Sequence, residues 1–208
     1  MITDVLFKRY PESIHFPFDF PYEVSVCLRQ IASVIFDDLS PHIGGPEKAC
    51  SLAYSKFIRE LGYQIGLSNF PHPGRKTDAM ICGQALSEDY DIRNHSHGSG
   101  EDYFLHRLSL AELILAEMEK LWPTNGKSLE VWKSGVAEIN TRLRSVRSTY
   151  LPFHYHNGIF QLAEDSLSQE VIHEPFWEIL HHPKWKNVDA DMKEAIDRRD
   201  SGKRDAVL

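Results

Sequence analysis

The stretch Leu105-His-Arg-Leu-Ser-Leu-Ala-Glu-Leu-Ile-Leu-Ala-Glu-Met-Glu-Lys-Leu121 has a strong helical periodicity. Its apolar residues recur at intervals of three and four, which is the spacing of one face of an α-helix. The pattern predicts a helix from about Ser99 to Trp122. Ser99, followed three residues later by Asp102, resembles a capping box at its beginning.

Three further helices are predicted on the same grounds. Apolar residues at helical intervals indicate helices over about 21–39, 46–61 and 128–146. Residues 1–20 are expected to be irregular. Residues 62–100 are rich in glycine and are expected to form one long loop, which is a common place for functional residues.

The spacing of the apolar residues changes near residue 150, and this change predicts a β-hairpin over about 150–162. Asn157-Gly158 lies between two apolar, aromatic runs in Tyr150-Leu-Pro-Phe-His-Tyr-His-Asn-Gly-Ile-Phe-Gln-Leu162. A type I′ turn needs positive φ at both central residues, which favours Asn-Gly. A two-stranded hairpin is marginal by itself in water, so we expect this one to pack on the helices.

The composition limits the classes of function. The chain has 208 residues, of which 42% are hydrophobic, enough for a packed core, and its net charge of −7 argues against a surface that coats nucleic acid. Three cysteines without a CxxC pair predict neither a disulfide framework nor a zinc ribbon. The sequence has neither a signal-peptide pattern nor a run of 18 apolar residues, so we expect a cytoplasmic protein without a membrane partner.

The last residues predict the beginning of a helical hairpin. Residues 187–200 carry one apolar helical stripe, Ser201-Gly202 interrupts it, and the chain stops in a second helical segment that has no C-cap. The stripe consists of Val188, Met192, Ala195 and Ile196. We therefore expect this polypeptide to be the front part of a longer protein.

The region from Tyr155-His-Asn-Gly-Ile159 to Leu208 resembles a pattern of bacterial HEPN-domain proteins, in which an AbiJ-type abortive-infection N-terminal domain precedes the HEPN domain. The opening Phe7-Lys-Arg-Tyr-Pro11 and the helix at Leu28-Arg-Gln-Ile31 also resemble the start of such proteins. After the hairpin and an acidic link, the matching segments are Pro175-Phe-Trp177, Trp185-Lys-Asn-Val188 and Glu194-Ala-Ile-Asp-Arg-Arg-Asp-Ser-Gly202.

The resemblance, together with the helical pattern, implies a mainly α fold with one small hairpin. It implies an AbiJ-like helical domain over 1–149, the hairpin and a connecting helix over 150–183, and a truncated HEPN-like helical hairpin over 184–208. The implied role is a regulatory or sensing module of an antiphage abortive-infection system. The implied partners are a HEPN catalytic segment in cis or in trans, an RNA or phage-derived trigger, and further copies of the chain in a homo-oligomer.

HEPN domains are typically metal-independent ribonucleases with an Arg-x4–6-His motif, whose His acts as general acid or base and whose Arg stabilises the developing charge. In this family the motif lies beyond Leu208, so we predict no catalytic residue and no cofactor in this polypeptide. Arg9-x5-His15 and Arg147-x6-His154 fit the bare spacing. Such matches are expected by chance in a chain this rich in arginine and histidine, and each spans a proline that would interrupt a helix.

A glycine-rich cluster and one hairpin strand hold the remaining candidate residues. Two histidines at i and i+2 could ligate a metal ion from an extended segment, although a solvated loop explains them too, because no HExxH helix accompanies them. The metal candidates are His95, His97, Asp102 and His106, and the candidates for contact with a ligand or RNA are Arg93, Asn94, His154, Tyr155 and His156.

Alternation along a strand places His154 and His156 on one face and Tyr155 on the other. That face could bind a metal ion or RNA, with an aromatic stacking partner, or the strand could simply be half-exposed. Two other functions stay open beside the regulatory one. The first is a small metal-dependent hydrolase or nuclease built on His95 and His97, and the second is a purely structural dimerisation module.

Overall fold

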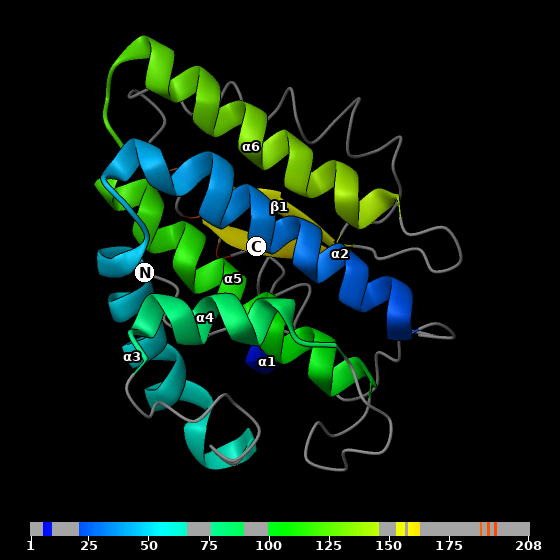
Figure 1. Ribbon diagram of the computed structural model, residues 1–208. Coiled ribbons are helices and arrows are strands. Elements are labelled where there is room, and N and C mark those ends of the chain that lie inside the picture. Colours follow the sequence, from blue (N-terminus) through cyan, green and yellow to red (C-terminus); the bar gives the residue numbers. More distant parts are fainter. Residues whose placement is uncertain are drawn as a thin grey trace.

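The computed structural model describes residues 6–9, 21–65, 76–89, 100–145, 153–156 and 158–162, together with the single residues 188, 191 and 194. Within these ranges the fold is mainly helical, with one two-stranded antiparallel sheet (Figure 1). None of the helices there has the length and apolar character that crossing a bilayer requires. The predicted mainly α fold with one small hairpin is therefore confirmed.

The described elements follow one another as helices and then a hairpin. The helical elements are α1 (Leu6–Arg9), α2 (Pro21–Ser33), the π-helix η1 (Val34–Leu39), the 3-10 helix η2 (Ser40–Ile43), α3 (Glu47–Ile65), α4 (Asp78–Ser87), α5 (Gly100–Leu121) and α6 (Gly126–Arg144). The strands are β1 (Phe153–His156) and β2 (Ile159–Leu162).

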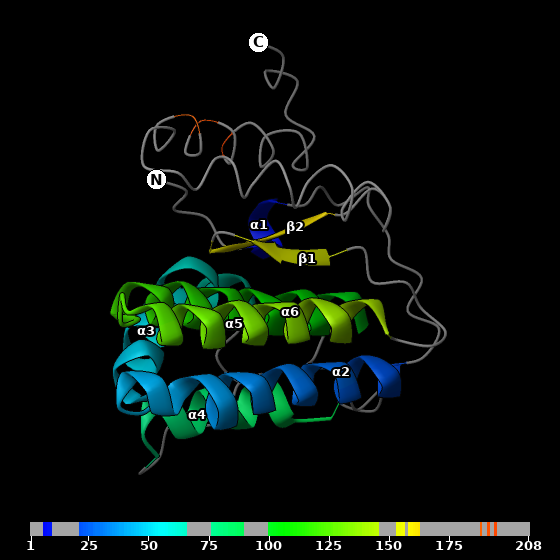
Figure 2. The ribbon, with the colours of Figure 1, turned by 90° about the horizontal axis from the view of Figure 1, so that it is seen from above.

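Helix α5 is the centre of the packing. It contacts α1, α2, α3, α4, η2 and β2, and buried residues occur around most of its circumference, as expected for a helix enclosed by other elements. Figure 2 shows α5 and α6 as a layer between the hairpin on one side and α2 with α4 on the other. The periodic stretch over 105–121 therefore forms the core helix of the molecule.

Four of the predicted helices are confirmed as α2 with η1, α3, α5 and α6. The prediction of one long loop over 62–100 is wrong, because α3 continues to Ile65 and α4 occupies Asp78–Ser87. Thr77 caps the beginning of α4 by accepting a hydrogen bond from Met80 N at 3.3 Å. At the other end, the Arg107 guanidinium of α5 donates to the carbonyl of Ala85 at 2.8 Å. Residues 1–20 were predicted as irregular, whereas α1 lies within them.

The predicted hairpin is present, and its strands lie on either side of Asn157-Gly158. Gly158 has a φ of 87°, and four residue pairs face each other across the strands. The pairs are Phe153 with Leu162, His154 with Gln161, Tyr155 with Phe160, and His156 with Ile159. The predicted connecting helix and most of the predicted HEPN-like segment lie outside the described residues. The three residues described there, Val188, Asp191 and Glu194, are helical, which tests neither domain assignment.

Helix α6 approaches η1 so closely that only glycine fits at one position. A Cβ atom placed on Gly135 would lie 2.5 Å from Leu39 Cδ2 and 3.0 Å from Leu39 Cγ. Leu39 is fully buried, so its side chain cannot move out into solvent to make room. The close contact between α6 and η1 therefore depends on the missing side chain at Gly135.

We predict that Gly135→Ala destabilises the fold. Alanine gains up to about 1 kcal/mol of helix propensity over glycine, but overpacking against Leu39 costs about 1–3 kcal/mol. We expect the free energy of unfolding, measured by urea titration, to fall by about 1–2 kcal/mol. Gly126→Ala is the matched control, because a Cβ atom at Gly126 meets nothing within 4 Å. Equal stability of the two variants would contradict the steric explanation.

Candidate functional site

The hairpin presents backbone groups that its own strands cannot satisfy. In an antiparallel pair with a two-residue loop, the pair next to the loop exchanges hydrogen bonds and the following pair points its N–H and C=O groups outward. Here the outward pair is Tyr155 and Phe160. Both residues are almost completely buried, so these groups need partners from other elements.

Asn140 of α6 satisfies the outward groups of Tyr155. Its Oδ1 accepts from Tyr155 N at 2.7 Å and its Nδ2 donates to Tyr155 O at 3.1 Å. A primary amide offers one donor and one acceptor side by side, as a peptide group of a neighbouring strand would. The same Nδ2 lies 3.4 Å from His154 Nε2. Asn140 thus takes the place of a third strand beside β1.

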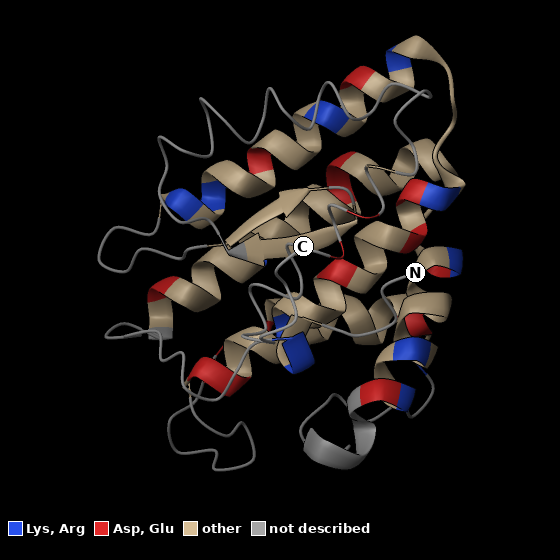
Figure 3. Cartoon of the chain, turned by 180° about the vertical axis from the view of Figure 1, so that it is seen from behind, with Lys and Arg blue, Asp and Glu red and all other residues tan. Residues whose placement is uncertain are grey.

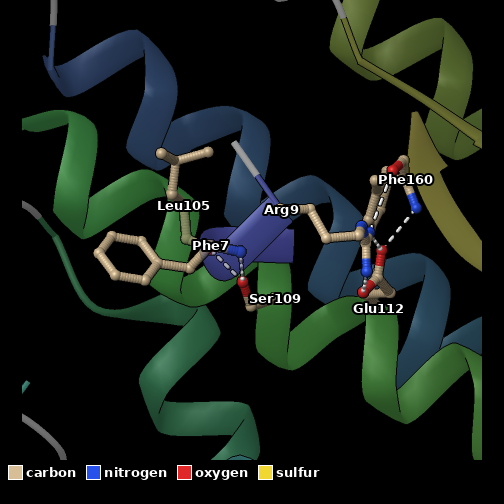
Figure 4. A network of polar contacts seen from close by, with 6 residues as sticks. All are labelled: Phe7, Arg9, Leu105, Ser109, Glu112 and Phe160. Carbon is tan, nitrogen blue, oxygen red and sulfur yellow. Dashed lines mark hydrogen bonds and ion pairs between the residues drawn. The ribbon is translucent and has the colours of Figure 1, made fainter. Parts of the chain in front are cut away.

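Glu112 of α5 and Arg9 of α1 satisfy the outward groups of Phe160 on the other edge (Figure 4). Glu112 Oε2 accepts from Phe160 N at 2.6 Å, and Arg9 Nη2 donates to Phe160 O at 3.2 Å. The two side chains also pair with each other, with Arg9 Nη1 and Nη2 lying 3.1 and 2.5 Å from the two carboxylate oxygens. This is a bidentate pair, the strongest common geometry for arginine and carboxylate.

The Arg9–Glu112 pair is buried, with side-chain exposures of 4% and 3%. A buried ion pair is costly to break by removing one member, because the remaining charge stays uncompensated away from water. In this pair one carboxylate joins three elements: α1 through Arg9, α5 through Glu112 itself, and β2 through Phe160. We call Arg9, Glu112, Asn140 and the backbone groups of Tyr155 and Phe160 the hairpin clamp.

His106, one of the predicted metal candidates, has a packing role in the structure. Its ring lies 4.3 Å from the Phe7 ring, centroid to centroid. Its Nε2 is buried and has no hydrogen-bond partner in the part of the chain that the structure describes. Burial lowers the pKa of His106 to about 4, with Asp102 opposing and Arg107 adding to the shift. The ring is therefore neutral near pH 7.

The metal-site prediction receives no support from the described ranges. Asp102 lies in the first turn of α5, one helical turn before His106, where a carboxylate suits the positive end of the helix dipole. Among the described residues, no group of three or more His, Cys, Asp or Glu side chains could hold a metal ion. The other two metal candidates, His95 and His97, lie outside the described residues and stay a prediction, as do Arg93 and Asn94, which were predicted to contact a ligand or RNA.

The hairpin candidates are more buried than a half-exposed strand would be. His154 and His156 share one face, as predicted, with ring centroids 6.2 Å apart and planes inclined by 22°. His154 is 4% exposed and Tyr155 is 1% exposed. Tyr155 packs edge-on against Phe160 at 5.0 Å. Burial, with Glu119 and Glu112 adding, raises its pKa well above the usual range. Tyr155 is a core residue in this fold and does not present a stacking surface.

A cleft of about 420 Å³ lies between α2 and the end of α6. It is lined by Tyr22, Glu23, Val26, Cys27, Gln30, Arg142 and Ser145. Cys27 Sγ lies 3.6 Å from the carbonyl of Arg142, and burial raises the pKa of this thiol to about 12. Because the thiolate is the reactive form, Cys27 is not an activated nucleophile.

The basic residues in the last turn of α6, Arg142 and Arg144, are part of a mixed-charge surface. Arg142 pairs with Glu138 one turn earlier, and acidic and basic residues alternate along the helix (Figure 3). This arrangement agrees with a solvated helix end and is not the one-sided basic patch that nucleic-acid binding usually shows.

Comparison of the chain with protein-family models, with curated proteins and with solved structures gives no match.

We predict that Asn140→Ala destabilises the fold by loosening β1. Removal of the amide leaves the buried N–H and C=O groups of Tyr155 without their partner, and each such group costs about 1–3 kcal/mol. We expect the free energy of unfolding in urea to fall by at least about 2 kcal/mol. Thr141→Ala is the neighbouring control, because Thr141 is exposed and its hydroxyl donates to Ala137 O of the same helix. The prediction fails if the two variants lose similar stability.

We predict that His106 makes the fold less stable as the pH falls from about 6.5 to about 4. In the folded chain the pKa of His106 is about 4, below the ordinary histidine value of 6.5. As the pH falls, the unfolded chain therefore binds the proton first, and the unfolded state is stabilised relative to the folded state across this window. The loss is at most about 3 kcal/mol. Unfolding free energies of the original chain and of His106→Phe, measured at pH 7 and at pH 4.5, test this. The substitution should reduce the pH dependence, and an equal pH dependence in the two chains would contradict the prediction.

Proposed function

We propose that this chain is a regulatory or sensing module of a bacterial abortive-infection system and that it acts together with a HEPN ribonuclease segment. The ordered resemblance of residues 155–208, and of the opening residues, to AbiJ-type HEPN-domain proteins supports the proposal. A homo-oligomeric state, an RNA or phage-derived trigger and a cytoplasmic location belong to the same proposal. The ribonuclease residues would lie on the HEPN segment, in cis or in trans.

The observation that carries the proposal is that the ionisable groups buried in the described core form ion pairs that hold elements of the fold together. Arg9 and Glu112 hold the hairpin, and Arg107 pairs with Glu88 at the end of α4. Glu117 pairs with both Lys56 and Lys120. General acid–base catalysis needs a group that reaches the substrate and has a pKa near the working pH, and these paired groups serve packing instead.

The hairpin is the element through which such a module could act on a following segment. The resemblance begins at Tyr155 of the hairpin, where Asn140 holds one edge, and the Arg9–Glu112 pair holds the other edge at Phe160. A cue that loosens or tightens these contacts would change how the chain continues after β2. The proposal therefore places regulation in the docking of the hairpin.

We predict that the purified chain alone cleaves neither single-stranded RNA nor tRNA. The test adds a HEPN-domain segment, supplied in cis or in trans. We expect that segment to co-purify with the chain and to supply RNA cleavage that disappears when the His of its Arg-x4–6-His motif becomes Ala.

Two results would contradict the proposal. Metal-dependent cleavage by the chain alone, lost in a His95→Ala and His97→Ala double variant, would favour the metal-dependent nuclease. A folded chain that neither binds the HEPN segment nor changes its activity would favour a purely structural module.

A further inference from the structure

Helix α1 docks on the molecule in the manner of a bound peptide. It has only four residues, and Leu6 and Arg9 are buried whereas Lys8 faces outward. The contacts described for α1 join residues that are 52 to 151 positions apart in the sequence. The described contacts of α1 are therefore all with elements distant in the sequence.

Three contacts hold α1 on its docking surface, and Figure 4 shows the one between Phe7 and Ser109. Leu6 is fully buried as an apolar anchor. Phe7 donates its backbone N–H to Ser109 Oγ at 2.9 Å, and Ser109 Oγ in turn donates to Leu105 O at 2.7 Å. The Phe7 ring also lies against His106. Together these contacts fix the direction and register of the segment.

The Arg9 side chain supplies the specific part of the recognition. Its guanidinium reaches both oxygens of Glu112 and the carbonyl of Phe160. A lysine ammonium cannot form the same planar fork. Lys8, by contrast, makes an ion pair with Glu60 at 3.3 Å, with side-chain exposures of 30% and 22%, and such exposed pairs contribute little. The sequence pattern that the docking surface recognises is thus Leu-Phe-x-Arg.

Docking of α1 is coupled to docking of the hairpin through Glu112. The carboxylate accepts from Arg9 and from Phe160 N, and Arg9 completes the pair by donating to Phe160 O. If α1 leaves, Phe160 O loses a donor and Glu112 loses its bidentate cation. Two events that share one buried group affect each other's free energy reciprocally.

We propose that α5 and β2 form a peptide-binding site for a Leu-Phe-x-Arg segment. The chain occupies this site with its own residues 6–9, and the occupied site holds the hairpin against α5. The bound ligand is a peptide with an aliphatic, an aromatic and an arginine side chain in this order. Residues 10–20 separate α1 from α2 and can span at most about 40 Å, so chain length allows α1 to leave the site while α2 stays in place. The inference is independent of the regulatory function proposed above.

Hydrogen exchange of the full chain, followed by mass spectrometry, tests this proposal. We expect Arg9→Ala to make the amides of 153–162 exchange at least about tenfold faster, as the loss of one charged hydrogen bond implies, while buried amides of α5 change less. Lys8→Ala is the matched control on the same short helix and should leave hairpin exchange unchanged.

A synthetic peptide with the sequence of residues 1–10 provides the second half of the test. Added in excess to the Arg9→Ala chain, it should bind and restore slow exchange in the hairpin. The same peptide carrying Arg9→Ala should do neither, and one carrying Lys8→Ala should act like the original. Success of this test would not depend on any RNA or HEPN segment.

Three results would overturn the proposal. One is unchanged hairpin exchange in a folded Arg9→Ala chain. Another is failure of the original peptide to bind or to slow exchange at millimolar concentration, and the third is equal rescue by the Arg9→Ala peptide. If Arg9→Ala does not fold, Arg9→Lys replaces it, because the charge is kept and only the fork is lost. Faster hairpin exchange in Arg9→Lys then supports the proposal, and exchange equal to that of the original chain rejects it.

Discussion

A two-stranded hairpin leaves outward-pointing N–H and C=O groups on both of its edges, and burying such groups without partners costs about 1–3 kcal/mol each. This molecule buries the hairpin on α5 and supplies the partners from side chains of three helices. Asn140 covers one edge and the Arg9–Glu112 pair covers the other. Glu112 is the most consequential of these residues, because its carboxylate is buried and is shared between α1 and β2. The positions of both elements follow from that shared group.

The sequence predicted those parts of the fold whose signals are local. The helical period of residues 105–121 predicted α5, and Asn157-Gly158 predicted the hairpin. Helix α4 was missed because it is short and depends on Thr77 at one end and on the distant Arg107 at the other. Arg9 and Asn140 give no local signal of their partners, which lie far away in sequence or on another element. Glu112 gives a partial signal, since it is an acidic residue inside the apolar pattern of a core helix.

The residues that the sequence suggests as functional differ from the polar residues that hold the hairpin in the structure. Histidines and aromatic residues attract functional interpretations, yet His106 and Tyr155 are packed in the described core with neutral side chains. The polar residues that matter most for the hairpin, Arg9, Glu112 and Asn140, belong to no catalytic motif. Their common role is to hold the hairpin on the helices. The regulatory function that we propose would act through this docking.

The most direct test of this account is residue-resolved amide exchange of the unmodified chain, measured by nuclear magnetic resonance at Tyr155 and Phe160. Neither amide is bonded within the hairpin, so a free hairpin would exchange both rapidly, whereas the hairpin clamp places each on a buried side-chain acceptor. The account predicts that both exchange as slowly as the buried amides of α5, such as that of Ile114. Rapid exchange at these two positions, with slow exchange retained in α5, would contradict it.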